Sequence, residues 1–157
     1  MNIAPLPSVS SLAETLVRAR ENAPYLRLSL EVQPELADLL ASENLEAAFE
    51  YSARAGEGAE NVRQKLRREK RALALTLAIG DLAGRLSLTD VITQLSDFAD
   101  RALDEALADI YATRYPDASL EGFSIIGLGK HGSRELNYSS DIDPIFIYDP
   151  DKIPVRG

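Results

Sequence analysis

The longest helical pattern in the chain stops abruptly before a proline, and this transition limits what the chain can fold into. Apolar residues recur at helical spacing over residues 95–110, and they are Leu95, Phe98, Ala99, Ala102, Leu103, Ala106, Leu107 and Ile110. Intervals of three and four residues place them on one helix face. Residues 87–90 read Ser-Leu-Thr-Asp, which predicts a capping box at the start of this helix. Pro116 cannot continue a helix, so the chain must change character there.

Beyond the proline the pattern favours strands. Residues 123–128 and 142–148 are short runs rich in isoleucine and aromatic side chains, and they enclose a polar connection with several glycines over residues 129–140. Such runs with turn residues between them predict two β-strands. The polar connection between two strands is therefore the first place to search for a functional site.

The part of the chain before residue 87 reads as helices. Residues 11–49 carry helical patterns in pieces, with Pro34 at a plausible first-turn position. Gly56 and Gly58 predict a long turn and a boundary near residue 57. A further helix follows, and its buried face is predicted to contain Val62, Leu66, Leu73 and Leu77.

That helix also carries a dense basic run. Six of the nine residues from 63 to 71 are basic, namely Arg63, Lys65, Arg67, Arg68, Lys70 and Arg71. The run is interpreted either as a solvated helix face or as a contact for an acidic partner surface. The whole chain has a net charge of -8, which argues against a non-specific nucleic-acid partner.

Composition excludes several other classes of protein. The chain has no cysteine and one histidine, His131, so neither a disulfide framework nor a zinc centre is expected. No apolar run reaches the roughly 18 to 20 residues of a membrane span, and the first ten residues lack the features of a signal peptide. We therefore expect a soluble, cytoplasmic protein with no membrane partner.

Two carboxylates spaced by two residues are the core of the candidate site. If Asp141 and Asp143 open a strand, the period of two directs both side chains to the same side. Two like charges held that close need a cation, and Mg²⁺ prefers oxygen ligands of this kind together with substrate phosphates. Asp141 and Asp143 are the predicted catalytic residues and metal ligands.

The turn before these carboxylates has the character of a phosphate site. Gly132 lets the backbone approach a phosphate, and Ser133 adds a hydroxyl donor. Lys130 and Arg134 flank the turn and would supply local positive charge in an acidic chain. These four residues are the predicted phosphate-binding and nucleotide-binding group.

Other polar residues of the connection receive structural interpretations. Glu135 is expected in the first turn of a helix, as a capping residue. Asn137 and either Ser139 or Ser140 are expected to shape the loop. His131 lies beside a glycine and is interpreted as exposed, without a catalytic role.

Two rival motifs fit less well. Residues 127–132 satisfy the glycine pattern of a dinucleotide-binding fold, with Asp149 as a possible ribose ligand, but only eight residues separate Gly132 from Asp141. A parallel crossover through a helix needs roughly a dozen or more. An EF-hand calcium loop is excluded by Pro144 and the apolar run after it.

The Gly-Ser pair and the Asp-x-Asp pair, with seven residues between them, resemble the signature of the DNA polymerase β-like nucleotidyltransferase superfamily. More narrowly, residues 129–143 resemble the bacterial glutamine synthetase adenylyltransferase/adenylyl-removing enzyme. The resemblance extends upstream through the basic run and residues 95–100, and so covers roughly residues 60–150. The family has two catalytic domains in one long chain, and the arrangement here resembles the first.

The resemblance implies a reaction and its partners. In the family the first domain removes AMP from adenylylated glutamine synthetase by phosphorolysis, which gives ADP, and the second, absent here, transfers AMP from ATP. It also implies a two-metal Mg²⁺ site and a nitrogen-signalling regulatory protein as a partner. The superfamily supplies a further metal carboxylate from a later strand, so we expect a partial chain that is inactive alone.

Two departures from the family pattern keep an alternative open. His131 stands where the family usually has leucine, and Pro144 replaces an apolar residue, where it is expected to remove a ladder N–H. The alternative is a non-catalytic helical interaction module that carries a degenerate nucleotidyltransferase remnant.

The predicted fold class is α+β, with a helical region followed by the first two strands of a mixed α/β nucleotidyltransferase domain. The predicted divisions are an N-terminal helical segment (1–57), a helical scaffold (58–117) and the incomplete start of the catalytic domain (118–157).

Overall fold

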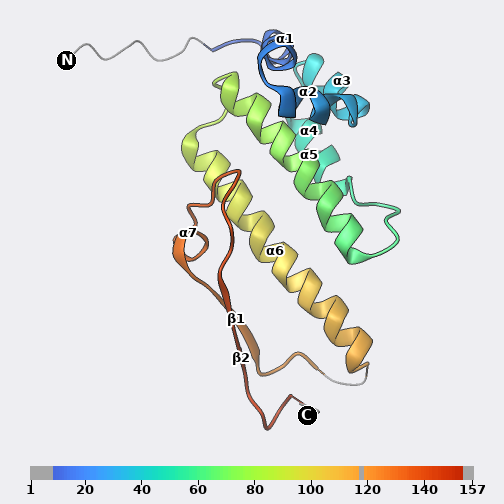
Figure 1. Cartoon of the computed structure of the whole chain (residues 1–157), viewed down its shortest axis with the longest axis vertical. Coiled ribbons are helices and arrows are strands. Elements are labelled where there is room, and N and C mark those ends of the chain that lie inside the picture. The colour runs from blue at the N-terminus through green and yellow to red at the C-terminus, as the bar shows by residue number, and fades with distance from the viewer. Residues whose placement is uncertain (1–8, 117–118, 154–157) are drawn as a thin grey trace, which may run out of the picture. The chain divides into compact units, whose positions relative to one another are not determined.

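The computed structural model describes residues 9–116 and 119–153, and the fold in this part of the chain is α+β, as expected (Figure 1). The elements in chain order are α1 (Leu12–Asn22), α2 (Pro24–Glu31), α3 (Pro34–Ala41), α4 (Leu45–Arg54), α5 (Val62–Leu82), α6 (Leu88–Arg114), β1 (Phe123–Gly127), α7 (Gly129–Gly132) and β2 (Pro144–Tyr148). None of the helices in the described ranges is both long enough and apolar enough to cross a membrane.

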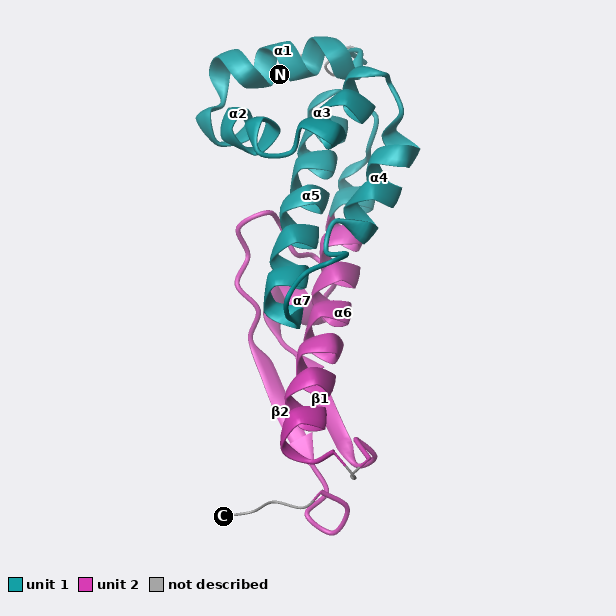
Figure 2. Ribbon diagram, turned by 90° about the vertical axis from the view of Figure 1, so that its right-hand side faces the viewer, with its two compact units in different colours: residues 1–91 teal, residues 92–157 magenta. Residues whose placement is uncertain are grey.

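The chain divides into two compact units, Met1–Val91 and Ile92–Gly157 (Figure 2). The division falls near the start of α6 and does not coincide with the boundaries inferred from the sequence at 57 and 117. Helices α4 and α5 pack against each other across the first of those positions. The second falls on residues 117 and 118, which lie outside the described residues.

Side-chain caps and prolines set the helix starts in the first unit. Ser11 caps α1 in a full capping box with Glu14, and Asn44 and Asn61 accept backbone N–H groups at the starts of α4 and α5. Helices α2 and α3 each begin at a proline, which has no N–H to lose in a first turn. The helical pieces predicted over residues 11–49, including the position of Pro34, are confirmed.

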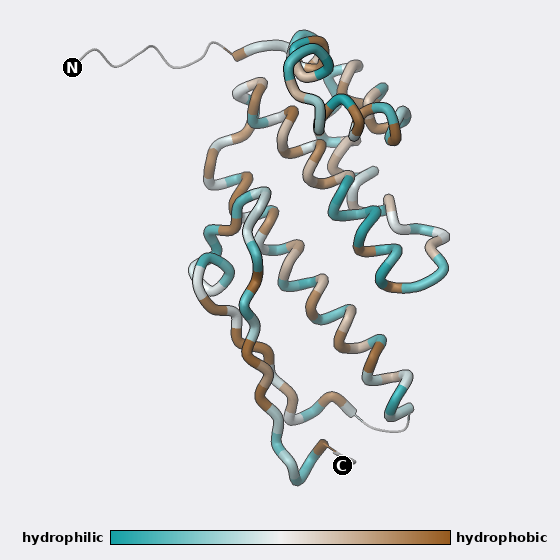
Figure 3. Tube along the Cα trace, viewed as in Figure 1, coloured by the Kyte–Doolittle hydropathy of each residue, from teal (hydrophilic) through white to brown (hydrophobic). Residues whose placement is uncertain are grey.

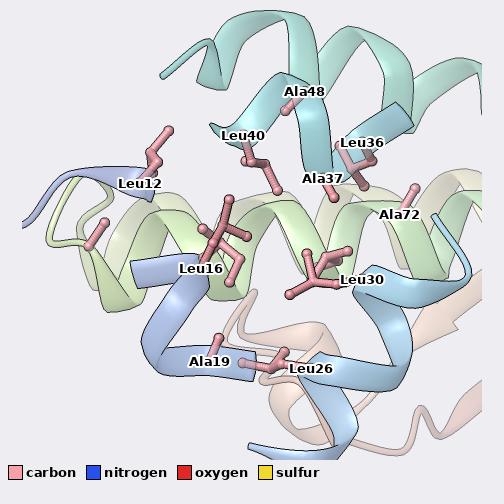
Figure 4. Close-up of a cluster of buried hydrophobic side chains, with 13 residues drawn as sticks. Leu12, Leu16, Ala19, Leu26, Leu30, Leu36, Ala37, Leu40, Ala48 and Ala72 are labelled. Carbon is pink, nitrogen blue, oxygen red and sulfur yellow. The ribbon is translucent and has the colours of Figure 1, made fainter. Parts of the chain in front are cut away.

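The core of the first unit is built from leucines and alanines of α1 to α5 (Figure 4). Leu12, Leu36 and Leu40 are completely buried, and each such side chain stabilises the fold by about 1.5–3 kcal/mol relative to exposure. A polar link crosses the same unit, because the hydroxyl groups of Ser52 and Thr76 lie 2.9 Å apart in the interior. That bond satisfies two hydroxyls that would otherwise be costly to bury.

Helix α5 has an exposed basic half and a buried apolar half. The basic run is solvent-exposed except at Lys65, which is half-buried and forms an ion pair with the buried carboxylate of Glu69. Farther along, Leu73 and Leu77 are buried, as predicted. Residues 62 and 66 are only half-buried, so the predicted apolar face is complete only in the second half of the helix.

Helix α6 begins as the sequence indicates. The Ser87 N–H donates to the Asp90 carboxylate at 2.8 Å, and the Asp90 N–H donates to the Ser87 hydroxyl at 3.1 Å. This is the predicted capping box. At the far end of the helix, the prediction of the buried apolar stripe is wrong by one residue. Ile110 is exposed, whereas Tyr111 is buried.

The sheet of the second unit is an antiparallel pair of β1 and β2, in which Phe123 lies opposite Tyr148 and Gly127 lies opposite Pro144. The Leu128 N–H donates to the Asp143 carbonyl at 3.1 Å. Hydrogen-bonded and non-hydrogen-bonded residue pairs alternate along an antiparallel ladder. Because Leu128 and Asp143 form a hydrogen-bonded pair, the adjacent pair of Gly127 and Pro144 is a non-hydrogen-bonded one. Pro144 therefore costs no hydrogen bond to β1, contrary to the expectation from the sequence, and it occupies the first strand position, where proline is tolerated.

The hairpin is apolar on both faces. Ile126 and Ile145 are each more than two-fifths exposed, as are Phe146 and Ile147. The apolar character of both strands is visible in the hydropathy colouring (Figure 3). These strands show an apolar run rather than the alternation of a half-solvated hairpin.

Candidate metal and phosphate site

The candidate site is the connection between β1 and β2. After β1 ends at Gly127, the chain makes the single turn of α7, and then returns through an irregular segment to β2. The bond between the Leu128 N–H and the Asp143 carbonyl closes this connection at its base. The residue before α7 and the residue before β2 are therefore neighbours, which brings the two halves of the sequence motif to the same end of the sheet.

The two predicted metal ligands lie at this end. Asp141 and Asp143 precede β2, which begins at Pro144, so they stand just outside the strand rather than within it. Both are exposed, and neither carboxylate forms a hydrogen bond or an ion pair with another described residue. Two unpartnered carboxylates fit the oxygen-donor chemistry of Mg²⁺. Among the described residues no third acidic, histidine or cysteine side chain joins them.

Gly132 and Ser133 lie at the end of α7, and their backbone N–H groups donate within the turn. The Gly132 N–H bonds to the Leu128 carbonyl at 3.1 Å, and the Ser133 N–H bonds to the Gly129 carbonyl at 3.0 Å. The Ser133 hydroxyl donates to Glu135 at 3.1 Å. A phosphate would therefore meet the Ser133 hydroxyl only if it replaced the carboxylate of Glu135.

Lys130 and Arg134, the two basic residues predicted to bind phosphate, have different surroundings. Lys130 is exposed and has no side-chain partner in the described part of the chain. Arg134 contacts two carboxylates of α6: it donates to Asp100 at 3.0 Å and forms a short hydrogen bond with Asp97. The hydrogen bond and charge of Asp97, followed by those of Asp100, raise the pKa of Arg134 further above its ordinary value.

His131 is buried, so the interpretation of this residue as an exposed loop histidine is wrong. Its side chain is 4% exposed, and its Nε2 lies 2.7 Å from the Asp100 carboxylate. Its Nδ1 is buried without a partner in the described structure. The residues around His131 do not indicate this burial, because the partner of the imidazole lies 31 residues earlier in the chain.

The remaining polar residues of the connection stabilise its shape. The Asn137 side chain accepts from the Ser139 N–H and from the Ser140 hydroxyl, and the Ser140 hydroxyl accepts from the Asn137 N–H at 3.0 Å. The prediction that these residues shape the loop is confirmed. Glu135, however, follows α7 instead of opening a helix, so its predicted place in a first helical turn is wrong.

A cavity of about 330 Å³ lies beside the loop, between α6 and β1. Asp100 and Asp104 contribute carboxylates to its wall, and His131 and Gly127 contribute another part. Two carboxylates in one wall disfavour an anion, so this cavity is not a phosphate pocket. The candidate site remains at the exposed side of the loop, where Lys130, Asp141 and Asp143 have no side-chain partner among residues 9–116 and 119–153.

Comparison with known proteins identifies relatives across the whole chain. The family model described as glutamate-ammonia ligase adenylyltransferase matches residues 4–157. A bifunctional glutamine synthetase adenylyltransferase/adenylyl-removing enzyme of Xanthobacter autotrophicus is 36% identical over 152 residues, which is 89% of this chain and 15% of the relative. Proteins of the same name from Burkholderia mallei and Caulobacter vibrioides are 37% and 39% identical, over 76% and 61% of this chain and 14% and 11% of their own lengths. No solved structure matches the chain.

Proposed function

Because the chain belongs to the glutamate-ammonia ligase adenylyltransferase family, we propose that it supplies part of a metal-dependent centre that acts on the AMP group of adenylylated glutamine synthetase. The chain spans about 15% of the length of the curated relatives it matches. The activity of the whole enzyme, its protein substrate and its nucleotide therefore come to this chain by proposal.

One observation carries the proposal. Asp141 and Asp143 are exposed carboxylates that have no partner in the part of the chain that the structure describes. The bond between the Leu128 N–H and the Asp143 carbonyl holds them at the same end of the sheet as the turn that contains Gly132 and Ser133. Asp90 and Asp100, by contrast, are already engaged in a helix cap and an ion pair. Carboxylates without such a role are available to a cation.

The proposed chemistry assigns each residue a limited role. Asp141 and Asp143 would hold Mg²⁺, which would neutralise phosphate charge when bound. Lys130 would bind a phosphate oxygen as a point charge, and the Ser133 hydroxyl would orient it. In the proposed phosphorolysis, an oxygen of inorganic phosphate forms a bond to the AMP phosphorus, the bond from that phosphorus to the tyrosine oxygen breaks, and the phenol leaves with a proton while ADP is released.

The test places the chain within a working enzyme. A chimera would carry residues 4–157 in place of the matching segment of the Xanthobacter relative, and release of ADP from adenylylated glutamine synthetase would be measured with Mg²⁺ and phosphate. We expect the Asp141→Asn and Asp143→Asn variants to lose ADP release by a factor of at least about 100, in line with removal of a charge-stabilising group. Asp151→Asn, in the turn after β2, is the matched control and should keep it. Equal activity in all three variants would contradict the assignment.

A second candidate function is a helical interaction module without catalysis. It is favoured by one observation: no third metal-ligand side chain joins Asp141 and Asp143 within the described residues. If the chimera binds glutamine synthetase but releases no ADP, while the unmodified relative does, the interaction module becomes the better interpretation.

A further inference from the structure

The loop that follows α7 is attached to helix α6 at successive points. His131 contacts Asp100 at 2.7 Å, and Arg134 contacts both Asp97 and Asp100. Two residues after Arg134, the backbone N–H of Leu136 donates to the Ser96 hydroxyl of α6 at 3.4 Å. The Leu136 side chain is buried. Asp100 is the only carboxylate in the described structure that contacts both His131 and Arg134.

The backbone of the loop depends on these contacts. Arg134 has a positive φ of 59°, which is unfavourable for a residue with a side chain. Its N–H donates to the His131 carbonyl at 3.0 Å, and the next N–H, of Glu135, donates to the Lys130 carbonyl at 2.7 Å. These two backbone bonds close the turn around Arg134 at the end of α7, and the side-chain bonds from Arg134 attach that turn to α6.

The charge arrangement makes Arg134 a weaker attractor of phosphate than Lys130. The guanidinium lies between two carboxylates, so the group formed by Arg134, Asp97 and Asp100 has a net negative charge when His131 is neutral. A phosphate near the guanidinium would therefore also meet the negative charge of both carboxylates. Lys130, one residue before the buried imidazole, keeps its charge available.

We propose that Asp100 is a positioning residue, which fixes residues 130–135 through His131 and Arg134 so that Lys130 and Ser133 face the phosphate. The inference rests on the proposed function for the identity of the ligand, but the attachment itself belongs to this chain alone. Asp100 never touches the phosphate in this arrangement. It acts by keeping the left-handed turn closed and by giving the buried imidazole the one hydrogen-bond partner that it has among the described residues.

The first test measures the attachment in this chain. Amide hydrogen exchange, followed by NMR, would be compared for the wild type, Asp100→Asn and Asp104→Asn. Asp104 is one turn farther along α6, is exposed and has no side-chain partner among the described residues, so it is a matched control. We expect exchange at the Arg134 and Glu135 amides to rise about 10-fold or more in Asp100→Asn, as a buried polar group loses its charged partner. It should stay within about twofold of wild type in Asp104→Asn, and the β1–β2 amides should be unchanged in both.

A variant of Arg134 separates side-chain contacts from backbone strain. Arg134→Gly removes the strain of the positive φ and the contacts to α6 together. If backbone conformation alone determines the loop, this variant protects the Glu135 amide at least as well as wild type, and the proposal is overturned. Faster exchange in Arg134→Gly supports the attachment. Equal exchange in wild type and Asp100→Asn also overturns it.

The second test uses the chimera and separates this inference from the proposed function. We expect Asp100→Asn to raise the KM for inorganic phosphate about 10-fold with a smaller change in kcat, whereas Asp104→Asn leaves both unchanged. An active chimera whose phosphate KM ignores Asp100→Asn overturns the positioning role while the proposed function stands. A wild-type chimera without activity counts against the proposed function, and the exchange measurement then decides the attachment on its own.

Discussion

Gly129 and Gly132 begin and end α7, and each excludes a side chain for a different physical reason. A Cβ at Gly132 would lie 2.4 Å from the carbonyl oxygen of Gly127 and 3.2 Å from its carbon. The obstacle is backbone, so no rotamer change relieves it. A Cβ at Gly129 would meet nothing within 4 Å, but the residue has a φ of +55°, which is the left-handed region. Lack of space therefore excludes a side chain at Gly132, whereas the left-handed backbone conformation disfavours one at Gly129.

The two costs differ in size and in how they are relieved. The contact at Gly132 is more than about 1 Å shorter than a favourable separation, and overpacking of this kind costs about 1–3 kcal/mol. The left-handed conformation costs an alanine at Gly129 about 1 kcal/mol. Since each 1.4 kcal/mol is a factor of ten, exchange of the Ser133 amide should rise about 5-fold in Gly129→Ala and about 5- to 150-fold in Gly132→Ala.

Asparagine distinguishes the two mechanisms in the same assay. It tolerates the left-handed region better than alanine does. Gly129→Asn should therefore exchange more slowly than Gly129→Ala, whereas Gly132→Asn should be no better than Gly132→Ala. The reasoning is refuted if Gly132→Ala exchanges like wild type, or if asparagine gives no advantage at Gly129.

Three further predictions concern other parts of the chain. Leu40→Ala should lower the free energy of unfolding of the first unit by about 2–5 kcal/mol in urea titrations, whereas Leu28→Ala, at a position that is 57% exposed, should change it by less than about 0.5 kcal/mol. Arg67→Glu should raise the thermal midpoint slightly, because it replaces two like-charge pairs at spacing four with opposite-charge pairs worth about 0.2–0.5 kcal/mol each. The hydrogen bond from the Ser87 hydroxyl lowers the pKa of Asp90, so the contribution of this carboxylate to stability is present above its unfolded pKa and is lost as pH falls through the folded one. An NMR titration should find the Asp90 pKa below the ordinary aspartate range in wild type and closer to it in Ser87→Ala.

Local patterns predicted the elements well, because their causes are local. The capping box at Ser87 and Asp90, the first-turn position of Pro34 and the first strand, predicted over residues 123–128 and found over 123–127, all depend on neighbours within four or five residues. The loop-shaping role of Asn137 has the same origin, since its partners are two and three residues away. In these cases the sequence contains the whole interaction.

Partners distant in sequence explain what the patterns missed. Arg134 was predicted to bind phosphate, and the sequence did not show that its side chain also contacts two carboxylates 34 and 37 residues earlier in the chain. His131 was wrongly expected to be exposed, because its partner Asp100 is also distant in the sequence. A signal was present in α6, where Asp97 and Asp100 stand beside the apolar stripe one turn apart, but its meaning required knowing which loop packs there. Pro144 also shows the limit, since its cost depends on the register of the strand pair.

The charges around the loop lead to a last prediction about the order of binding. Two cationic side chains, Lys130 and Arg134, stand against the five carboxylates of Asp97, Asp100, Glu135, Asp141 and Asp143, which leaves a net charge of -3 with His131 neutral. The Arg134 charge is already compensated by α6. An anion approaching this surface is repelled until a divalent cation reduces the negative charge.

Phosphate binding to this chain should therefore depend on a divalent cation. Titration of inorganic phosphate, followed by the amide shifts of Lys130 and Ser133, should show no saturation without Mg²⁺ and measurable saturation with it. Asp143→Asn should weaken the binding seen with Mg²⁺ and strengthen the binding seen without it, because the substitution removes both a metal ligand and a repelling charge. This crossed response separates a metal-bridged phosphate from a phosphate bound by Lys130 alone, for which Asp143→Asn would strengthen binding in both conditions.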